Sequence, residues 1–154
     1  MLTNFNTLAG SSRLWIYGAE TALTEKEQLC ISERLTEFLE KWEYHQNKLL
    51  ASFHIFENRF IVVALDDSQY GVGGCSIDGL QKVIQELEKE LSISLLNRLN
   101  VFCKIDGYIE CIATTNLSNK ANSTTLFYDL TILKKSEIPN WLKPISRGWC
   151  SSFL

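Results

Sequence analysis

Residues 49–65 read LLASFHIFENRFIVVAL, two apolar runs joined by Glu57-Asn58. A separation of only two residues forces the two runs into an antiparallel hairpin. The second run, residues 60–65, is apolar without alternation, which is the pattern of a strand with both faces buried. The first run alternates between apolar and polar residues, so one of its faces is more exposed to solvent. This stretch therefore predicts a hairpin of strands 49–56 and 59–65, with 60–65 central in the sheet.

The residues before this hairpin predict a strand followed by a long helix. Residues 13–17, RLWIY, combine aromatic and β-branched side chains and predict a first strand. Thr24 and Glu27 have the spacing of a capping box, which begins a helix. Apolar residues then recur every three or four positions, so one face of the helix packs on a sheet. We expect the helix to end near residues 44–47, where Asn47 can adopt the left-handed conformation of a cap.

The residues after the hairpin read YGVGGCSIDG over positions 70–79 and then become periodic. The apolar spacing predicts a second helix over about 79–91, with Asp78 as its N-cap. Ser76 is a competing N-cap. Residues 70–78 are thus expected to form a loop that presents its side chains at the start of a helix.

A second hairpin is predicted by Asp106-Gly107, the strongest two-residue turn signal in the chain. Its strands are 101–105 and 108–113. In this register Cys103 faces Glu110 and Phe102 faces Cys111. The two cysteines then lie on opposite faces of the sheet, so no disulfide is expected between them.

The remaining segments carry weaker signals. Residues 1–12 are a polar lead-in that we expect to be flexible, and residues 114–125 are polar and turn-rich, which predicts an exposed loop. A strand is predicted at 126–133. The two prolines in 136–144 allow at most a short helical turn. The tail, 145–154, is irregular but aromatic, so we expect it to dock on the body.

The predicted order of elements is strand, helix, strand, strand, helix, strand, followed by extra strands. This is the βαββαβ order of ferredoxin-like folds. It predicts an α+β sandwich with two helices on one face of a mostly antiparallel sheet. Because element order does not fix which strands are neighbours, other α+β topologies remain open. A chain of 154 residues has the common size of a single domain.

The charge of the chain disfavours some classes of partner. The formal net charge is −3, with 15 Lys and Arg against 18 Asp and Glu. Such a chain has no basic field to attract phosphate backbones, so a nucleic-acid partner is not expected. No apolar run is long enough to cross a bilayer, and residues 1–10 lack the features of a signal peptide. We therefore expect a cytoplasmic protein without membrane insertion.

The cysteines do not form a metal motif. There are five, with no Cys-x-x-Cys pair, and only two histidines accompany them. Structural zinc sites need closer ligand spacing, so neither a metal nor another cofactor is expected. An odd number of cysteines without an export signal is typical of reduced thiols in a reducing compartment.

The glycine-rich stretch before the second helix is the one candidate site. A helix start exposes unpaired N–H groups at the positive end of its dipole, which can hold an anion. The same position favours the thiolate form of a cysteine, the form that acts as a nucleophile. Alternatively, the glycines only form the connection between a strand and a helix, and the cysteine side chain packs against its neighbours. The candidate ligand-binding residues are Gly73, Gly74, Cys75, Ser76 and Asp78, with Cys75 as the candidate catalytic residue.

Known nucleotide and hydrolase motifs are missing from this stretch. A Walker A loop needs a Gly-Lys-Ser/Thr end, and no such string occurs. Gly71-Val72-Gly73-Gly74 begins like a dinucleotide fingerprint but lacks the third glycine. A cysteine hydrolase also needs a histidine within hydrogen-bond reach of the thiol. Only His45 and His54 are available, and either is more often a surface or satisfied residue than a base.

Several strings together resemble a family of small bacterial proteins that are often labelled as an ABC transporter ATPase. The strings are Trp15-Ile16-Tyr17, Phe38 to His45, Phe60 to Ala64 and Gly74 to Asp78, and the likeness covers most of residues 13–100. The resemblance implies a bacterial cytoplasmic setting. Because the chain has neither a Walker A string nor a signature motif, ATP hydrolysis is not expected.

Two functional hypotheses follow from these observations. The first is a non-enzymatic α+β module that binds a partner protein or a small anionic ligand beside the stretch 73–78. The second is a thiol-dependent enzyme or redox sensor that uses Cys75. The ligand, the partner and the oligomeric state do not follow from the sequence.

Overall fold

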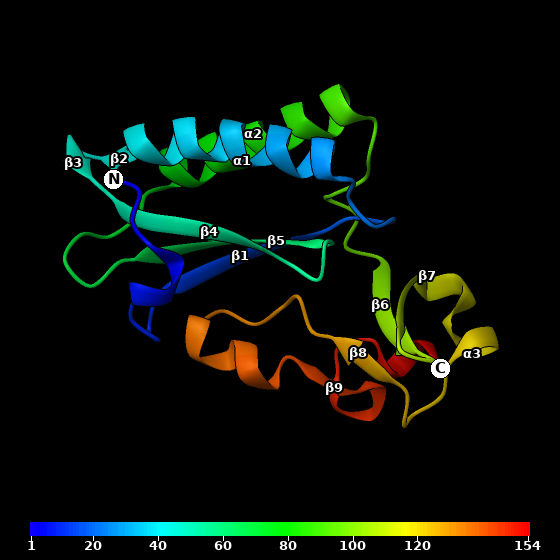
Figure 1. The fold of residues 1–154 in the computed structure, drawn as a ribbon. Helices are drawn as coiled ribbons and strands as arrows, with labels where there is room; N and C mark the ends of the chain where they lie inside the picture. The colour runs from blue at the N-terminus through cyan, green and yellow to red at the C-terminus, as the bar shows by residue number, and fades with distance from the viewer. The chain divides into compact units, whose positions relative to one another are not determined.

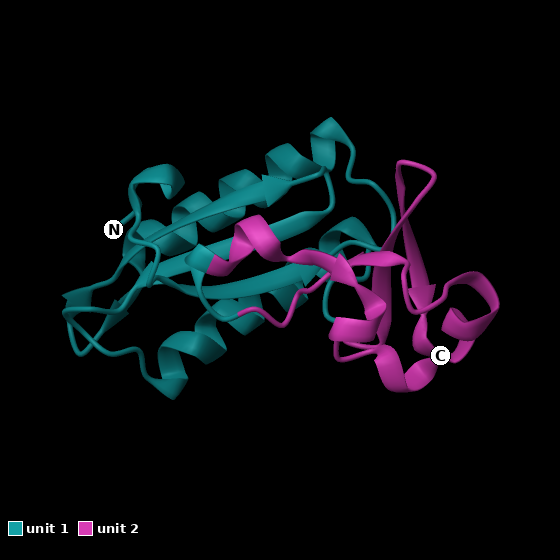
Figure 2. Ribbon diagram, turned by 90° about the horizontal axis from the view of Figure 1, so that it is seen from below, with its two compact units in different colours: residues 1–96, 133–136 teal, residues 97–132, 137–154 magenta.

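The structure, a computed structural model, describes residues 1–154. The chain forms two compact units, shown in different colours in Figure 2. Unit 1 comprises residues 1–96 and 133–136, and unit 2 comprises residues 97–132 and 137–154. The single domain expected from the chain length stays a prediction, because compactness does not test whether either unit folds alone.

Unit 1 contains a three-stranded antiparallel sheet in the order β1-β5-β4. Its strands are β1 (Arg13–Gly18), β4 (Leu50–Phe56) and β5 (Phe60–Asp66). The central place of β5 and its hairpin with β4 are as predicted. The connection is one residue longer than predicted, because Phe56 pairs with Phe60 and residues 57–59 lie between the strands. Glu57 and Asn58 have φ angles of 56° and 55°, the left-handed values that a tight hairpin turn needs.

Two helices, α1 (Glu25–Lys41) and α2 (Gly74–Leu91), lie on the same side of this sheet (Figure 1). The predicted capping box of α1 is present. The Glu27 N–H donates to the Thr24 hydroxyl over 3.1 Å, and the Thr24 N–H donates to the Glu27 carboxylate over 2.9 Å. These two bonds satisfy two of the N–H groups that a helix start leaves unpaired.

The end of α1 differs from the prediction of 44–47. The helix ends at Lys41, and Trp42 follows in an extended conformation. A small hairpin comes next, formed by β2 (Glu43–Tyr44) and β3 (Asn47–Lys48). His45 and Gln46 adopt positive φ angles of 50° and 67° in its turn. Asn47 is therefore a strand residue and not the cap of the helix.

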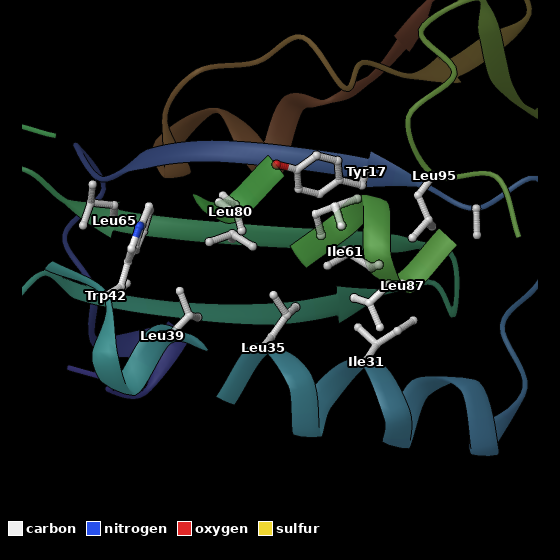
Figure 3. Packing of buried hydrophobic residues seen from close by; sticks show 14 of the residues in the cluster. Tyr17, Ile31, Leu35, Leu39, Trp42, Ile61, Leu65, Leu80, Leu87 and Leu95 are labelled. Carbon is white, nitrogen blue, oxygen red and sulfur yellow. The ribbon is translucent and has the colours of Figure 1, made fainter. Parts of the chain in front are cut away.

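The core of unit 1 lies between the sheet and the two helices. Leu35 and Leu39 of α1 and Leu80 and Leu87 of α2 point toward the strands (Figure 3). Each of these four leucines is fully buried. Each leucine buried in this way stabilises the fold by about 1.5–3 kcal/mol relative to an exposed side chain. The prediction that both helices cover one face of the sheet is confirmed.

Unit 2 contains a four-stranded antiparallel sheet in the order β7-β6-β8-β9. Its strands are β6 (Asn100–Ile105), β7 (Tyr108–Ala113), β8 (Leu126–Tyr128) and β9 (Leu142–Pro144). The predicted strand at 126–133 is thus reduced to its first three residues.

The turn between β6 and β7 forms as predicted. Asp106 and Gly107 have φ angles of 52° and 82°, which only a few residue types adopt readily. The predicted register is also confirmed, since Cys103 pairs with Glu110 and Phe102 pairs with Cys111. All five cysteines are free.

The α+β class and the antiparallel sheets are confirmed, but the ferredoxin-like topology is not. That topology requires the strand after the second helix to join the first sheet. Here β6 pairs with β7 and β8 instead. The strands that follow the Asp106-Gly107 turn supply β6 with partners in its own sheet, a competition that element order does not reveal.

Short helices occupy the stretches where the sequence predicts a lead-in, a loop and a tail. Leu117 in the predicted loop and Ile145 in the tail are fully buried. The tail packs on the core of unit 2 through Ile145 and Cys150, whereas the aromatic residues Trp149 and Phe153, on which the prediction rested, are exposed. The short helices are η1 (Phe5–Thr7), η2 (Thr114–Asn116), α3 (Leu117–Lys120), η3 (Lys135–Asn140), η4 (Ile145–Arg147) and η5 (Ser151–Phe153).

Candidate functional site

The stretch predicted as a loop forms the first turns of α2. The helix begins at Gly74, five residues before the predicted start, with Gly73 as its N-cap. Ser76 and Asp78 lie inside the helix, so neither is the N-cap that the sequence predicts. No side chain caps this helix start. The first N–H groups of α2 therefore face no capping group from the chain.

Two hydrogen bonds to the segment after α1 hold this first turn. The indole Nε1 of Trp42 donates to the backbone carbonyl oxygen of Ser76 over 2.8 Å. The Ser76 hydroxyl donates in turn to the backbone carbonyl oxygen of Glu43 over 2.8 Å. Ser76 is only 8% exposed. These tertiary contacts compensate for the poor helix propensity of the glycines, which explains why the helix begins early.

Gly73 is required by the close approach of an aromatic ring. A Cβ atom at this position would lie 2.4 Å from Cε1 of Tyr44. Any larger residue would displace the ring of Tyr44 or the start of α2. The β2–β3 hairpin and the first turn of α2 are therefore packed against each other.

A cavity of about 480 Å³ lies between α1 and α2 and includes part of this turn. We call it the α1–α2 groove. Cys75, Ser76 and Gly79 line it from α2. Gly73, Gly74 and Asp78 do not line it. The structure thus brings two of the five predicted ligand-binding residues into one hollow.

Part of the groove lining is apolar. Phe38 from α1, Trp42 after it and Val83 from α2 line this part. The rings of Phe38 and Trp42 lie 5.5 Å apart between centroids. In the sequence these residues fall at the apolar positions of two helical patterns that are far apart in the chain. The packing of the two helices brings the half-buried side chains of Phe38 and Val83 and the buried ring of Trp42 to the same groove.

The charged residues around the groove include both signs. Arg34, Glu37, Lys41 and Glu43 complete its lining. Arg34 is paired with two carboxylates of α2, at 2.5 Å from Glu86 and 2.9 Å from Glu90. Lys41 Nζ lies 4.0 Å from a carboxylate oxygen of Glu37. Since both cations have carboxylate neighbours, the groove does not concentrate positive charge.

The Cys75 thiol has no histidine beside it in the groove. Cys75 is exposed, but neither histidine lines the groove. His45 packs on Tyr44 with their centroids 4.0 Å apart, and His54 packs on Phe5 and Phe56. A nucleophilic cysteine needs a base within hydrogen-bond reach, and these contacts provide none.

The five thiols should differ strongly in reactivity toward iodoacetamide. Burial, then the Glu90 carboxylate, raises the pKa of Cys30, and burial raises the pKa of Cys103 to about 12. Burial also raises the pKa of Cys150. A higher pKa means less of the reactive thiolate at a given pH. We therefore expect the exposed Cys75 to be alkylated before Cys30, Cys103 and Cys150 at pH 8, as measured by tryptic mass spectrometry over time. Faster labelling of Cys30 or of a buried thiol would contradict the structure.

No group of three or more His, Cys, Asp or Glu side chains is placed to hold a metal ion. No helix has both the length and the apolar character to span a membrane.

Comparison with models of known families, with curated proteins and with solved structures finds no match to the chain. The resemblance to the bacterial family therefore stays a prediction. The function has to be argued from the groove itself.

Proposed function

We propose that the chain is a non-enzymatic module that binds a segment of a partner protein in the α1–α2 groove. The supporting observation is the pairing of an apolar lining with a rim of both charges. Protein interfaces commonly have an apolar centre rich in aromatic residues and a polar rim. Phe38, Trp42 and Val83 supply the first feature, and Arg34 and Lys41 with their carboxylate neighbours supply the second.

A protein segment fits this groove better than a small anion. Small-ligand sites usually bury most of the ligand and converge a few polar groups on it. The rim residues Glu37, Lys41 and Cys75 are exposed, and the cations already have carboxylate neighbours. The uncapped start of α2 is the remaining feature that favours an anion. On the family resemblance and the five free thiols, the proposal places this module in the bacterial cytoplasm.

Gly79 offers a way to fill the groove without damaging the fold. A Cβ at this position would lie 3.4 Å from Cε1 of Phe38, an ordinary contact. Glycine inside a helix costs roughly 0.5–1 kcal/mol relative to alanine. Gly79→Ala should therefore stabilise α2 while it places a methyl group in the groove. Gly74 has nothing within 4 Å of its Cβ position and does not line the groove, so Gly74→Ala is a matched control.

Three baits test the proposal: wild type, Gly79→Ala and Gly74→Ala. Each is immobilised in an extract of the native cell, and captured proteins are quantified by mass spectrometry. We expect a protein that wild type and Gly74→Ala retain equally, and that Gly79→Ala retains about tenfold less, the effect of roughly 1.4 kcal/mol of overpacking. Equal capture by all three baits, or no specific capture, would overturn the proposal.

The runner-up is a thiol-dependent enzyme or redox sensor that uses Cys75. It is supported by the exposure of this thiol and its place in the groove. We rank it second because neither histidine lines the groove beside the thiol. Adding Cys75→Ala to the set of baits separates the two. A binding module keeps its partner in this variant, because the substitution removes only one atom from the rim, whereas a thiol-dependent function is lost.

A further inference from the structure

Four residues from the second half of the chain belong to unit 1. Residues 133–136, which we call the clasp, lie in unit 1, while the residues on both sides of them lie in unit 2 (Figure 2). The clasp runs along the outer edge of β1. Backbone hydrogen bonds join Leu14 N–H to Leu133 O over 3.0 Å, Lys135 N–H to Ser12 O over 2.9 Å and Ser136 N–H to Gly10 O over 2.8 Å. The clasp therefore acts as a short additional strand at an edge of the sheet.

The side chain of Lys135 also anchors the clasp. Its Nζ donates to the backbone carbonyl oxygen of Leu8 over 2.7 Å and lies 5.2 Å from the ring centroid of Phe5. The three backbone hydrogen bonds add further anchors, each of which contributes about 1 kcal/mol net. Leu133 is 68% exposed, so it adds little burial. Release of the clasp should thus cost only a small part of the free energy of unfolding.

A short exposed linker connects the two units upstream of the clasp. The Glu88 carboxylate accepts the N–H groups of Leu95 and Leu96 over 2.8 and 2.9 Å, which fixes the end of unit 1. Residues 97–99 are then exposed and contain neither helix nor strand before β6 begins. A short exposed linker of this kind is where domain swapping takes its hinge.

We propose that the edge of β1 also accepts the clasp of a second copy of this chain, which gives a domain-swapped dimer. A second copy carries the same four residues and can make the same hydrogen bonds, so the contacts cost nothing extra. The monomer and the swapped dimer differ mainly in whether the clasp and the sheet that accepts it belong to one chain or to two. Within one chain, a short linker gives the clasp an effective concentration on the order of 1 mM. Monomer should therefore dominate at micromolar protein, and exchange should appear near millimolar protein.

A pair of introduced cysteines reports which copy supplies the clasp. A Cβ at Gly10 would lie 3.3 Å from Cβ of Ser136, close to the separation in a disulfide. Gly10→Cys and Ser136→Cys are combined with Cys75→Ser, which removes the exposed native thiol. The full chain is oxidised with glutathione disulfide at about 10 μM and at about 1 mM protein, below and near the effective concentration. Non-reducing electrophoresis then separates linked monomers from linked dimers.

We expect linked monomer at the low concentration and a dimer band that increases at least several-fold at the high one. The two single-cysteine variants measure dimers that arise from random collision. Inserting Gly-Ser-Gly-Ser after Arg98 should reduce the dimer band, because a longer linker relaxes closure within one chain. Linked monomer alone at both concentrations would overturn the proposal. A dimer band of the same intensity in the single-cysteine variants would also overturn it, and so would a dimer band that the longer linker leaves unchanged. The absence of any disulfide link at either concentration would overturn it as well. None of these outcomes depends on the α1–α2 groove.

Discussion

Gly148→Ala should lower the free energy of unfolding by about 1–3 kcal/mol, the usual cost of overpacking a core. A Cβ at this position would lie 2.1 Å from Cζ and 2.4 Å from Cε1 of Phe127. Phe127 is fully buried in the core of unit 2, so its ring has no open space to enter. The backbone of Gly148 is extended, with φ −108° and ψ 168°, so the cost comes from the ring and not from the dihedral angles. Urea unfolding followed by circular dichroism measures the change.

The cause can be isolated with a second substitution. Phe127→Leu shortens the side chain that the new methyl group would meet, so the double variant should lose less than the sum of the two single changes. Gly71→Ala is the matched control, because nothing lies within 4 Å of its Cβ position. Equal losses for Gly148→Ala and Gly71→Ala would show that the ring contact does not govern stability. Strict additivity in the double variant would show the same.

The parts of the fold that local chemistry determines could be predicted from the sequence. The side chains of Thr24 and Glu27 each accept a hydrogen bond from the other residue's backbone N–H. The turns at Glu57-Asn58 and Asp106-Gly107 each close a hairpin. Each signal involves residues close together in the chain, and the left-handed angles that the turns need restrict the residue types. The α+β class follows from these elements.

The parts that depend on distant contacts could not be predicted. The first turn of α2 contains glycines and has no side-chain cap, and it forms because Trp42 and Glu43 bond to Ser76. The membership of β6 in a second sheet depends on competition among strands for partners. Sequence patterns record propensity and periodicity, but they carry no information on which elements meet.

The same distinction applies to the candidate site. The sequence indicates Cys75 and Ser76 as candidate ligand-binding residues because a cysteine and several glycines precede a predicted helix. Arg34, Phe38 and Lys41 had no such signal, since they occupy ordinary positions on an amphipathic helix. They become part of a site only because α1 packs beside the start of α2. A search for motifs therefore finds one wall of the groove and misses the other.

Asp129→Asn should also destabilise the protein, by about 1.5–3 kcal/mol at neutral pH, the range for hydrogen bonds to charged groups. Asp129 is only 7% exposed. One carboxylate oxygen accepts bonds from the N–H and hydroxyl of Thr131, over 2.9 and 2.5 Å, and the other accepts from Lys143 Nζ over 2.9 Å. In the variant one of the two oxygens becomes an NH2 group, which would face a donor in either orientation, the Lys143 ammonium or the Thr131 N–H. The half-buried ammonium of Lys143 would also lose its counter-charge.

The loss should depend on pH in a defined direction. Burial alone would raise the pKa of Asp129, but the hydrogen bonds from Thr131 and Lys143 outweigh it and hold the pKa below its ordinary value of 3.8. Above that value the carboxylate is ionised in both the folded and the unfolded chain, so its stabilising contribution is fully present. As the pH falls through 3.8 and toward the folded pKa, the unfolded chain binds the proton first and the contribution is lost.

Urea unfolding of wild type and Asp129→Asn at a series of pH values tests this directly. The difference in free energy of unfolding should be constant between about pH 7 and pH 5 and should shrink in more acidic solution. Asp67→Asn, at an exposed position after β5, makes the same change in net charge and should show little difference at any pH. An Asp129→Asn cost that persists undiminished at low pH would mean that shape, and not charge, makes Asp129 important. A cost as small as that of Asp67→Asn would mean that the Lys143 pair adds nothing to stability, because its desolvation cancels its attraction.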